Sequence, residues 1–170
     1  DTTGGAAIAA LRLHNAMLKN GLDSTFFCLN RTVNGNETIK TFSSKSLFLK
    51  ISLYRLIKGL FNHIMLNGKK NGLFSNMNIG LRNIEVSKYD IIYIHWINNS
   101  FVSFSALAKI LKTGKPVYWF MHDMFPLTGG CHYSFDCSNY TKKCGKCSYL
   151  RKPYKYDFSY KQLKIKRKLF

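Results

Sequence analysis

The chain has 170 residues, of which 46% are hydrophobic and 15% aromatic, and this composition excludes an intrinsically disordered protein. Its 26 Lys and Arg residues against 8 Asp and Glu residues give a formal net charge of +18. This excess attracts polyanions of any kind, including nucleic acid, anionic lipid and phosphorylated substrates, and does not choose among them. The length suits one domain with a core. Because the sequence starts at Asp1 in a glycine-rich stretch, we expect a fragment of a longer protein.

The first 21 residues predict a glycine turn followed by a helix of small and apolar residues. Gly4 and Gly5 allow a tight turn, and Asn20-Gly21 marks the end of the helix. The helix is apolar on nearly all sides, which predicts burial against a sheet. Backbone N–H groups at its start favour a phosphate or a sugar hydroxyl, although a plain turn remains the alternative. The pattern is not G-x-G-x-x-G, so a nicotinamide dinucleotide site is not expected.

Residues 24–29 (STFFCL) predict a short strand, and the polar residues 30–45 predict a surface loop. The following stretch, Ser46 to Leu66, predicts an amphipathic helix, because its leucines and isoleucines recur every three or four residues. Four basic residues interrupt it, and this excludes a membrane span. Two locations for its apolar face stay open: the protein's own core, or the surface of an anionic membrane.

The second half alternates between strands and helices. Tyr89 to Trp96 and Val117 to His122 predict buried strands, and residues 100–116 predict a helix between them. A basic helix, with Asp157 or Ser159 as its N-cap, follows at the end. This alternation predicts an α/β protein with a Rossmann-like, doubly wound parallel sheet, whose first strand would lie upstream of Asp1.

Ligands of such sheets bind beyond the carboxyl ends of the strands. The Gly4-Gly5 turn, His95 and the pair His122-Asp123 fall at that edge in this arrangement. His122 and Asp123 are the candidate catalytic residues, with His122 as a general base or a hydrogen-bond donor to a substrate hydroxyl. A histidine satisfied by core contacts is the alternative for His122, and this alternative weighs more for His95.

Four cysteines, Cys131, Cys137, Cys144 and Cys147, follow in the pattern C-x5-C-x6-C-x2-C. The C-x2-C turn resembles a zinc knuckle, and four thiolates suit a closed structural zinc site, with His132 as a spare donor. Reduced thiols and two disulfides are the alternatives, and disulfides would require an oxidising compartment. A redox-active C-x-x-C pair is also considered, but it more often begins a helix after a strand.

Three stretches resemble the N-terminal domain of a bacterial GT-B glycosyltransferase of family 4, of the colanic-acid or exopolysaccharide type. They are GGAAIAALRLHNAMLKNG, YDIIYIHWINN and KPVYWFMHDMFPLTGGCHY, with the later cysteines, and the H-D-M-x-P-x-T-G-G-C-H-Y segment is the most specific. The resemblance covers most of the chain and is weakest over residues 34–87. It implies a Rossmann-like acceptor-side domain over residues 1–150 with a Cys-rich loop at 131–147. A basic helical extension over 151–170 would follow, and a nucleotide-sugar-binding domain would lie outside the chain.

By the same resemblance, Gly4, Gly5, His95, Gly129 and Gly130 are expected to bind substrate or donor. His122 matches the histidine near the transferred sugar, and catalysis would retain the anomeric configuration without a metal. The expected partners are a nucleotide sugar, a saccharide or lipid-linked acceptor and the anionic inner face of the cytoplasmic membrane, in cell-surface polysaccharide or lipopolysaccharide synthesis.

The chain departs from the family in lacking the paired glutamates E-x7-E, since its only glutamates are Glu37 and Glu85. We therefore expect residues 1–170 alone to lack hexosyltransferase activity. The competing hypothesis is a zinc-stabilised basic protein that binds nucleic acid. Its weakness is that the basic residues do not gather around the cysteines, so specific nucleic-acid binding is not expected.

Overall fold

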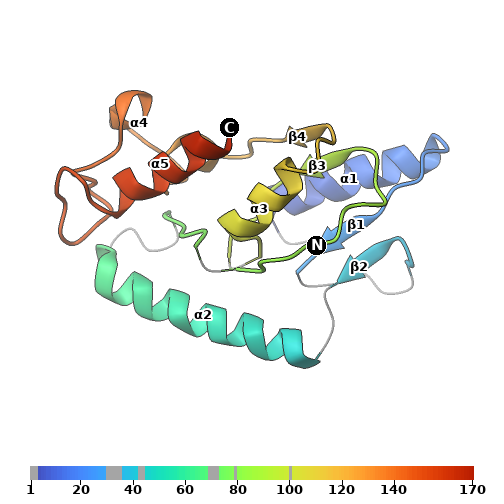
Figure 1. The fold of residues 1–170 in the computed structure, drawn as a ribbon, viewed down its shortest axis with the longest axis horizontal. Helices are drawn as coiled ribbons and strands as arrows, with labels where there is room; N and C mark the ends of the chain where they lie inside the picture. The colour runs from blue at the N-terminus through green and yellow to red at the C-terminus, as the bar shows by residue number, and fades with distance from the viewer. Residues whose placement is uncertain (1–3, 30–35, 42–44, 69–72, 79, 100) are drawn as a thin grey trace. The chain divides into compact units, whose positions relative to one another are not determined.

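The computed structural model of the chain describes residues 4–29, 36–41, 45–68, 73–78, 80–99 and 101–170 (Figure 1). The chain divides into unit 1, Asp1–Lys50, and unit 2, Ile51–Phe170, and each unit is described by itself. This division differs from the boundary at residue 150 that the sequence suggested.

Unit 1 begins with helix α1, Gly5–Lys19. Gly4 precedes it with φ 91°, and Gly21 follows it with φ 77°, so glycines occupy the two left-handed positions that border the helix. The predicted start and stop of this helix are therefore confirmed. Its predicted burial against a sheet holds only in part, because Ala10 and His14 are its only buried residues.

Two short parallel strands complete unit 1: β1, Phe26–Cys28, and β2, Ile39–Thr41. The first was predicted, whereas the second lies in a stretch that was predicted to be a loop. His14 connects α1 to this region, because its Nδ1 lies 2.8 Å from the Ser24 hydroxyl and its Nε2 lies 2.9 Å from the Thr38 hydroxyl. Burial lowers the pKa of His14. A buried, uncharged ring with both nitrogens bonded has a structural role.

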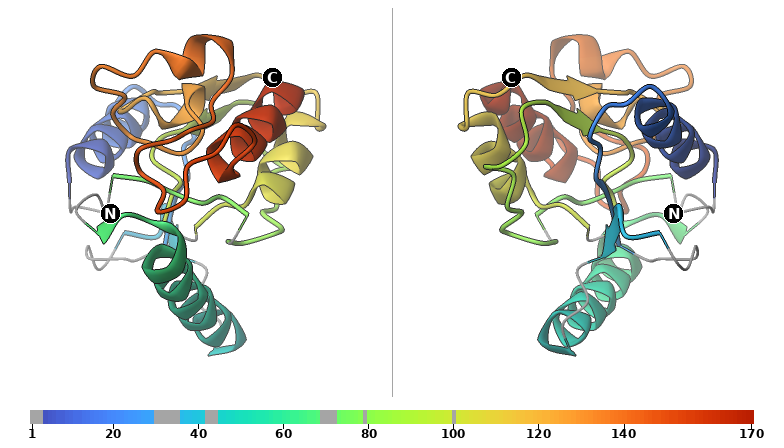
Figure 2. Two further views of the ribbon diagram at one scale, coloured as in Figure 1. Left: turned by 90° about the vertical axis from the view of Figure 1, so that its left-hand side faces the viewer. Right: turned by 90° about the vertical axis from the view of Figure 1, so that its right-hand side faces the viewer.

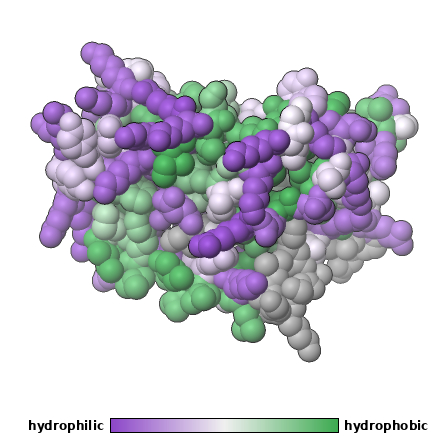
Figure 3. Space-filling model, viewed as in Figure 1, coloured by the Kyte–Doolittle hydropathy of each residue, from purple (hydrophilic) through white to green (hydrophobic). Residues whose placement is uncertain are grey.

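Helix α2, Lys45–Met65, confirms the predicted amphipathic helix. Its end is fixed by Arg151, whose backbone N–H donates to Met65 O and whose Nε donates to Leu66 O. Most of its apolar side chains are exposed: Leu49, Leu53, Leu56, Ile57, Leu60 and Ile64. Hydrophobic side chains gather in the same area in the space-filling view (Figure 3). Within the described residues, most of this face therefore lies outside the protein's own core, and the membrane alternative stays a prediction.

The described part of the chain contains no helix that is both long enough and apolar enough to cross a membrane.

Unit 2 contains a β-α-β motif made of β3, Ile92–Ile94, helix α3, Phe104–Leu111, and β4, Val117–Trp119. The strands are parallel, as predicted, with Ile92 opposite Val117. The Ser103 side chain caps α3 by accepting from the N–H of Ala106. In the described residues, the strands form two separate pairs, β1–β2 and β3–β4. The α/β class therefore holds, and one continuous doubly wound sheet is not confirmed.

The main core of unit 2 lies on one face of β3 and β4. Ile94 on the strands, Leu107 on α3 and Phe125 after β4 are all buried there. Helix α5, Phe158–Leu169, packs beside α3 on this core (Figure 2). The residues that alternate with them on the strands point the other way and are exposed, namely Tyr93, Tyr118 and Phe120. The predicted burial of both strand faces is therefore wrong for the structure described.

Helix α5 is part of unit 2, whereas the sequence suggested a separate basic extension. Asp157 is its N-cap, as predicted, and accepts from the N–H groups of Ser159 and Tyr160. Gln162, on the buried face of α5, donates through Nε2 to Ser75 O at 2.9 Å and to Gly129 O at 2.7 Å. These bonds attach α5 to the turn that contains the second diglycine.

The residues 131–147 run irregularly, apart from the short helix α4, Asn139–Lys142. A smaller apolar cluster lies beneath this segment and contains Leu66, Phe74, Cys131, Tyr149 and Leu150. An antiparallel bridge pairs Phe74 with Cys131. The first cysteine of the segment is thus fixed by backbone pairing as well as by apolar contact.

Gly129 is required by close packing, and this generates a stability prediction. A Cβ on Gly129 would lie 2.4 Å from Ser159 O, whereas a Cβ on Gly59 of α2 would meet nothing within 4 Å. We expect Gly129→Ala to lower the free energy of unfolding by about 1–3 kcal/mol through overpacking. The matched change Gly59→Ala should raise it by about 0.5–1 kcal/mol, since alanine favours a helix. Urea denaturation measures both, and equal effects would contradict the packing argument.

Candidate functional site

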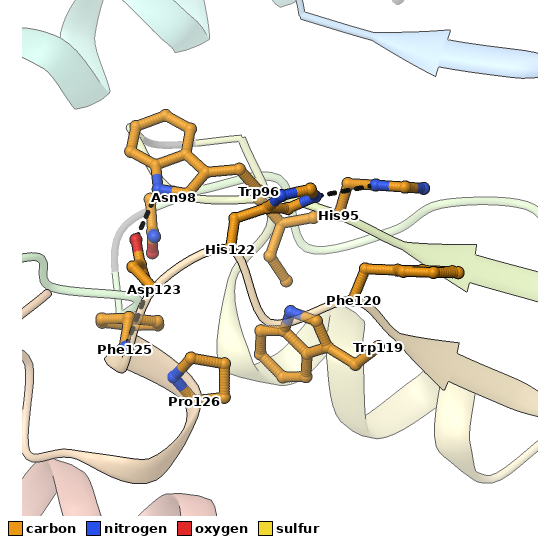
Figure 4. A pocket seen from close by; sticks show the side chains of 10 residues that line it. His95, Trp96, Asn98, Trp119, Phe120, His122, Asp123, Phe125 and Pro126 are labelled. Atoms are coloured by element: carbon orange, nitrogen blue, oxygen red, sulfur yellow. Dashed lines mark hydrogen bonds between the residues drawn. The ribbon is translucent and has the colours of Figure 1, made fainter. Parts of the chain in front are cut away.

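A pocket lies where β3 and β4 end at their carboxyl ends (Figure 4). Parallel strands bring their carboxyl ends to the same edge, so residues 27 positions apart in the sequence meet there. The lining side chains are mostly aromatic, imidazole, amide and carboxylate groups, joined by two aliphatic ones: His95, Trp96, Ile97, Asn98, Trp119, Phe120, His122, Asp123, Phe125 and Pro126. Apolar walls with a few polar groups are typical of a small-molecule site.

His95 and His122 form a pair at the rim of this pocket. His95 Nδ1 and His122 Nε2 lie 2.9 Å apart and share a hydrogen bond, and the two rings stack. His95 also stacks on Phe120 with an interplanar angle of 3°. Burial lowers the pKa of His95, and the nearby His122 lowers it further. At neutral pH, an uncharged His95 can accept a hydrogen bond from His122 or donate one to it. The ring nitrogens that this bond does not use are then available to a substrate hydroxyl.

Asp123 is bonded to three parts of unit 2. Its Oδ2 accepts from Trp96 Nε1 at 3.0 Å and from His132 Nδ1 at 2.6 Å, and its Oδ1 accepts from the N–H of Phe125 at 2.8 Å. Burial acts to raise the pKa of Asp123, but the bonds from His132, Phe125 and Trp96 outweigh it and hold that pKa below its usual range. With its oxygens engaged in this way, the carboxylate positions the pocket wall.

A buried relay continues behind Asp123. His132 Nε2 lies 2.8 Å from the hydroxyl of Ser75, and both side chains are buried. The order serine, histidine, aspartate resembles a hydrolase triad, but a hydroxyl that substrate cannot reach is not a nucleophile. Because both nitrogens of His132 are engaged, the expectation that this ring is a spare metal donor is wrong.

Lys166 of α5 supports the floor of the same region. Its side chain is 2% exposed, and its ammonium donates to the carbonyls of Phe125 and Thr128 and lies over the Phe125 ring. Burial lowers the pKa of Lys166 to about 7. Through these bonds Lys166 holds the turn that follows Asp123, which contains the 3₁₀ helix η2, Phe125–Leu127. The basic composition of α5 gave no sign that one of its lysines is buried.

The structure brings together three of the predicted site residues, His95, His122 and Asp123. Gly129 and Gly130 are buried, and a Cβ on Gly130 would lie 2.3 Å from the Phe74 ring, so close packing accounts for both glycines. Their predicted contact with a donor stays a prediction.

The diglycine Gly4-Gly5 precedes α1 in unit 1, whereas His122 lies in unit 2. The predicted closeness of the diglycine to His122 therefore stays a prediction. Trp96 was expected in the core. It is 38% exposed and forms part of the pocket wall. Its nearness in sequence to His95, at the end of a strand, was the one available sign of this position.

All four cysteines of the C-x5-C-x6-C-x2-C pattern line a second pocket. None of the five cysteines forms a disulfide. Burial, together with neighbouring cysteines, raises the pKa of Cys144 to about 12 and that of Cys147 to about 11. Thiols with such values are poor nucleophiles, which argues against the redox alternative.

A β-α-β motif with a pocket at the carboxyl ends of its strands is an arrangement in which α/β proteins bind ligands. Across 98% of its length, the chain is 30% identical, over 185 aligned positions, to a protein of Escherichia coli (strain K12). That protein carries the name "Putative colanic acid biosynthesis glycosyl transferase WcaC". The chain spans 42% of the length of this relative. No family model matches the chain, and no solved structure matches it.

The bonds to Asp123 generate a prediction on pH dependence. Because the pKa of Asp123 is lower in the folded chain than the unfolded value of about 3.9, its stabilisation is present above pH 4 and is lost as the pH falls through the folded pKa. We expect Asp123→Asn to cost about 1.5–3 kcal/mol at pH 7 and to flatten the loss of stability below about pH 4.

Urea denaturation between pH 7 and pH 3 measures this dependence. The exposed Asp136 provides a matched control, since Asp136→Asn should change neither the stability nor its pH profile. An Asp123→Asn variant as stable as the parent at pH 7 would show that the three bonds do not support the pocket.

Proposed function

We propose that the chain is part of a glycosyltransferase that transfers a sugar from a nucleotide-sugar donor to a saccharide or lipid-linked acceptor in cell-surface polysaccharide synthesis. The observation that carries this proposal is the pocket at the ends of β3 and β4, in a chain related over nearly its whole length to a glycosyl transferase. We do not propose nucleic-acid binding, because that relationship favours an enzyme.

Within such an enzyme, we assign this chain to the acceptor-side half of a GT-B architecture of family 4. The resemblance of the H-D-M-x-P-x-T-G-G-C-H-Y segment supports this assignment, as does the absence of a glutamate pair from the sequence. The donor nucleotide would then bind a second half outside residues 1–170. Gly4 and Gly5, at the exposed start of α1, would face the donor phosphates, since N–H groups at a helix start favour anions.

His122 is the residue that we place nearest the transferred sugar. It is exposed at the pocket rim and bonded to His95, so the pair can donate to one sugar hydroxyl and accept from another. Trp96 and Phe120, both partly exposed beside the pair, offer apolar surface against which a sugar ring can pack. Asp123 acts through Trp96 and the turn after β4, and is therefore a positioning residue. Catalysis would retain the anomeric configuration and use no metal.

The exposed apolar face of α2 supports a location at the inner face of the cytoplasmic membrane. Leu53, Leu56 and Leu60 are each more than half exposed along one side of the helix. Lys50 and Arg55 are exposed on the same helix, and the chain as a whole carries +18. An apolar stripe with basic neighbours suits an anionic bilayer surface, where a lipid-linked acceptor would be found.

Tryptophan fluorescence tests the pocket directly, because the only two tryptophans of the sequence, Trp96 and Trp119, line it. We expect acceptor oligosaccharides to change this emission and nucleotide sugars to leave it unchanged. His122→Ala should weaken saccharide binding at least about tenfold, roughly the loss of one or two hydrogen bonds. His63→Ala, an exposed change on α2, is the control.

A response to nucleotide sugars alone would place the donor in this pocket and contradict the acceptor-side assignment. Residues 1–170 should also give no turnover with nucleotide sugars and lipid-linked acceptors. Turnover by this chain alone would overturn the proposal that its partner half supplies the donor site.

Vesicle co-sedimentation tests the membrane surface. We expect the chain to bind vesicles rich in phosphatidylglycerol and to bind purely zwitterionic vesicles far less, because both charge and apolar area contribute. Combining Leu53→Ser, Leu56→Ser and Leu60→Ser should weaken binding at least about tenfold through the lost apolar area. The polar-face variant Ser52→Ala with Asn62→Ala should bind as the parent does. Binding that ignores lipid charge and the leucines would contradict this role of α2.

A further inference from the structure

The second pocket carries an inference that is independent of the proposed enzyme activity. We propose that Cys131, Cys137, Cys144 and Cys147 bind one zinc ion as four thiolate ligands, and that this site holds the segment 131–147 in place. Four sulfur ligands in tetrahedral geometry are typical of a structural zinc site, which has no open position for substrate.

Convergence of the four cysteines is the first observation. All four line the same pocket, although up to 16 sequence positions separate them, and all four are free thiols. Among the residues that the structure describes, no charged side chain lines this pocket. The fifth cysteine, Cys28, lies in β1 of unit 1 and takes no part.

The turn between Cys144 and Cys147 is tight, as the spacing of a C-x2-C pair requires. Gly145 has φ 136°, and a Cβ there would lie 2.3 Å from Lys155 O, so only glycine fits. Lys146 takes the left-handed conformation, with φ 50°, and its N–H donates to Tyr154 O. The N–H of Cys147 donates to the Asp157 carboxylate at 2.8 Å. Left-handed backbone at two successive residues turns the chain tightly between the two thiols.

The other two cysteines are anchored differently. Cys131 is held in place by its backbone bridge to Phe74 and by the hydroxyl of Thr128, which donates to Cys131 O at 2.5 Å. Cys137 is exposed at the outer lip, in a turn closed by its N–H to Ser134 O. The zinc site would therefore connect Cys131, on the inner wall of the pocket, to residues 133–143, which we call the outer strap.

The outer strap needs such a connection, because apolar packing does not supply one. No side chain between residues 133 and 143 is buried. Its tertiary bonds include those that exposed Arg167 donates to the carbonyls of Tyr140, Thr141 and Lys142. A segment with few buried contacts opens locally at low free-energy cost, unless a crosslink or a metal closes it.

Metal binding requires the thiols to turn towards one another. Among the residues that the structure describes, no three His, Cys, Asp or Glu side chains stand in the arrangement of a formed metal site. Rotation about the Cα–Cβ bonds of residues that already share a pocket would bring their sulfurs together. Each thiol would release one proton on binding, and four thiolates with Zn²⁺ would leave a charge of −2. Lys143 and Lys146, next to the ligands in sequence, would offset this charge.

Metal analysis of the purified intact protein tests the proposal. We expect one zinc per chain by mass spectrometry of the metal, released when a mercurial reagent blocks the thiols. Replacing zinc with cobalt(II) should give the strong visible absorption of tetrahedral thiolate coordination. Cys144→Ser should abolish the stoichiometric zinc, and Cys28→Ser should retain it as the matched control.

Cys137→Ser guards against variants that fail to fold, because Cys137 is exposed and its loss disturbs no core. This variant should stay folded, bind zinc at least about tenfold more weakly and show an altered cobalt spectrum, whereas Cys137→His should restore binding. Zinc-free protein with four alkylatable cysteines would overturn the proposal in favour of reduced thiols. Disulfides found by mass spectrometry in unreduced protein would overturn it in favour of covalent crosslinks.

Discussion

The pocket of unit 2 depends on one carboxylate. Asp123 accepts hydrogen bonds from Trp96, at the end of β3, from Phe125, in the turn after β4, and from His132, at the start of the Cys-rich segment. The end of β3, the turn after β4 and the start of the Cys-rich segment are thereby fixed at the carboxyl edge of the strand pair. A charged acceptor makes these bonds stronger than neutral ones, and the partial burial of the group strengthens them further. The histidine pair is held in position beside this carboxylate.

This arrangement separates two roles within the dipeptide His122-Asp123. His122 faces solvent at the rim and shares its inner nitrogen with His95, so it is available to a ligand. The carboxylate of Asp123 is bonded to other protein groups, and it holds the pocket wall in position. A serine–histidine relay extends behind it, with Ser75 57 positions from His132, and completes the polar network without an exposed nucleophile. The chemistry that remains is hydrogen bonding to a polar ligand between aromatic faces, which suits a sugar.

The sequence predicted the elements whose apolar patterns are long or regular. Helices α1, α2 and α5 and strands β3 and β4 were located because periodicity and caps such as Asp157 are local signals. Strand β2 was missed, since Ile39–Thr41 is a short run within polar residues and is defined by its pairing with β1. The positioning role of Asp123 was also missed, because its bonds to Trp96 and His132 depend on the fold and leave no pattern in the sequence. Likewise, nothing in the sequence of α5 distinguished the buried Lys166 from its exposed neighbours.

A crystal structure of the intact protein with a bound acceptor oligosaccharide tests the central claim most directly. The account predicts a sugar ring against Trp96 and Phe120 with a hydroxyl bonded to His122, while Asp123 still accepts from Trp96 and His132. A saccharide bonded to the carboxylate of Asp123 in place of those donors, or seated away from the ends of β3 and β4, would contradict it.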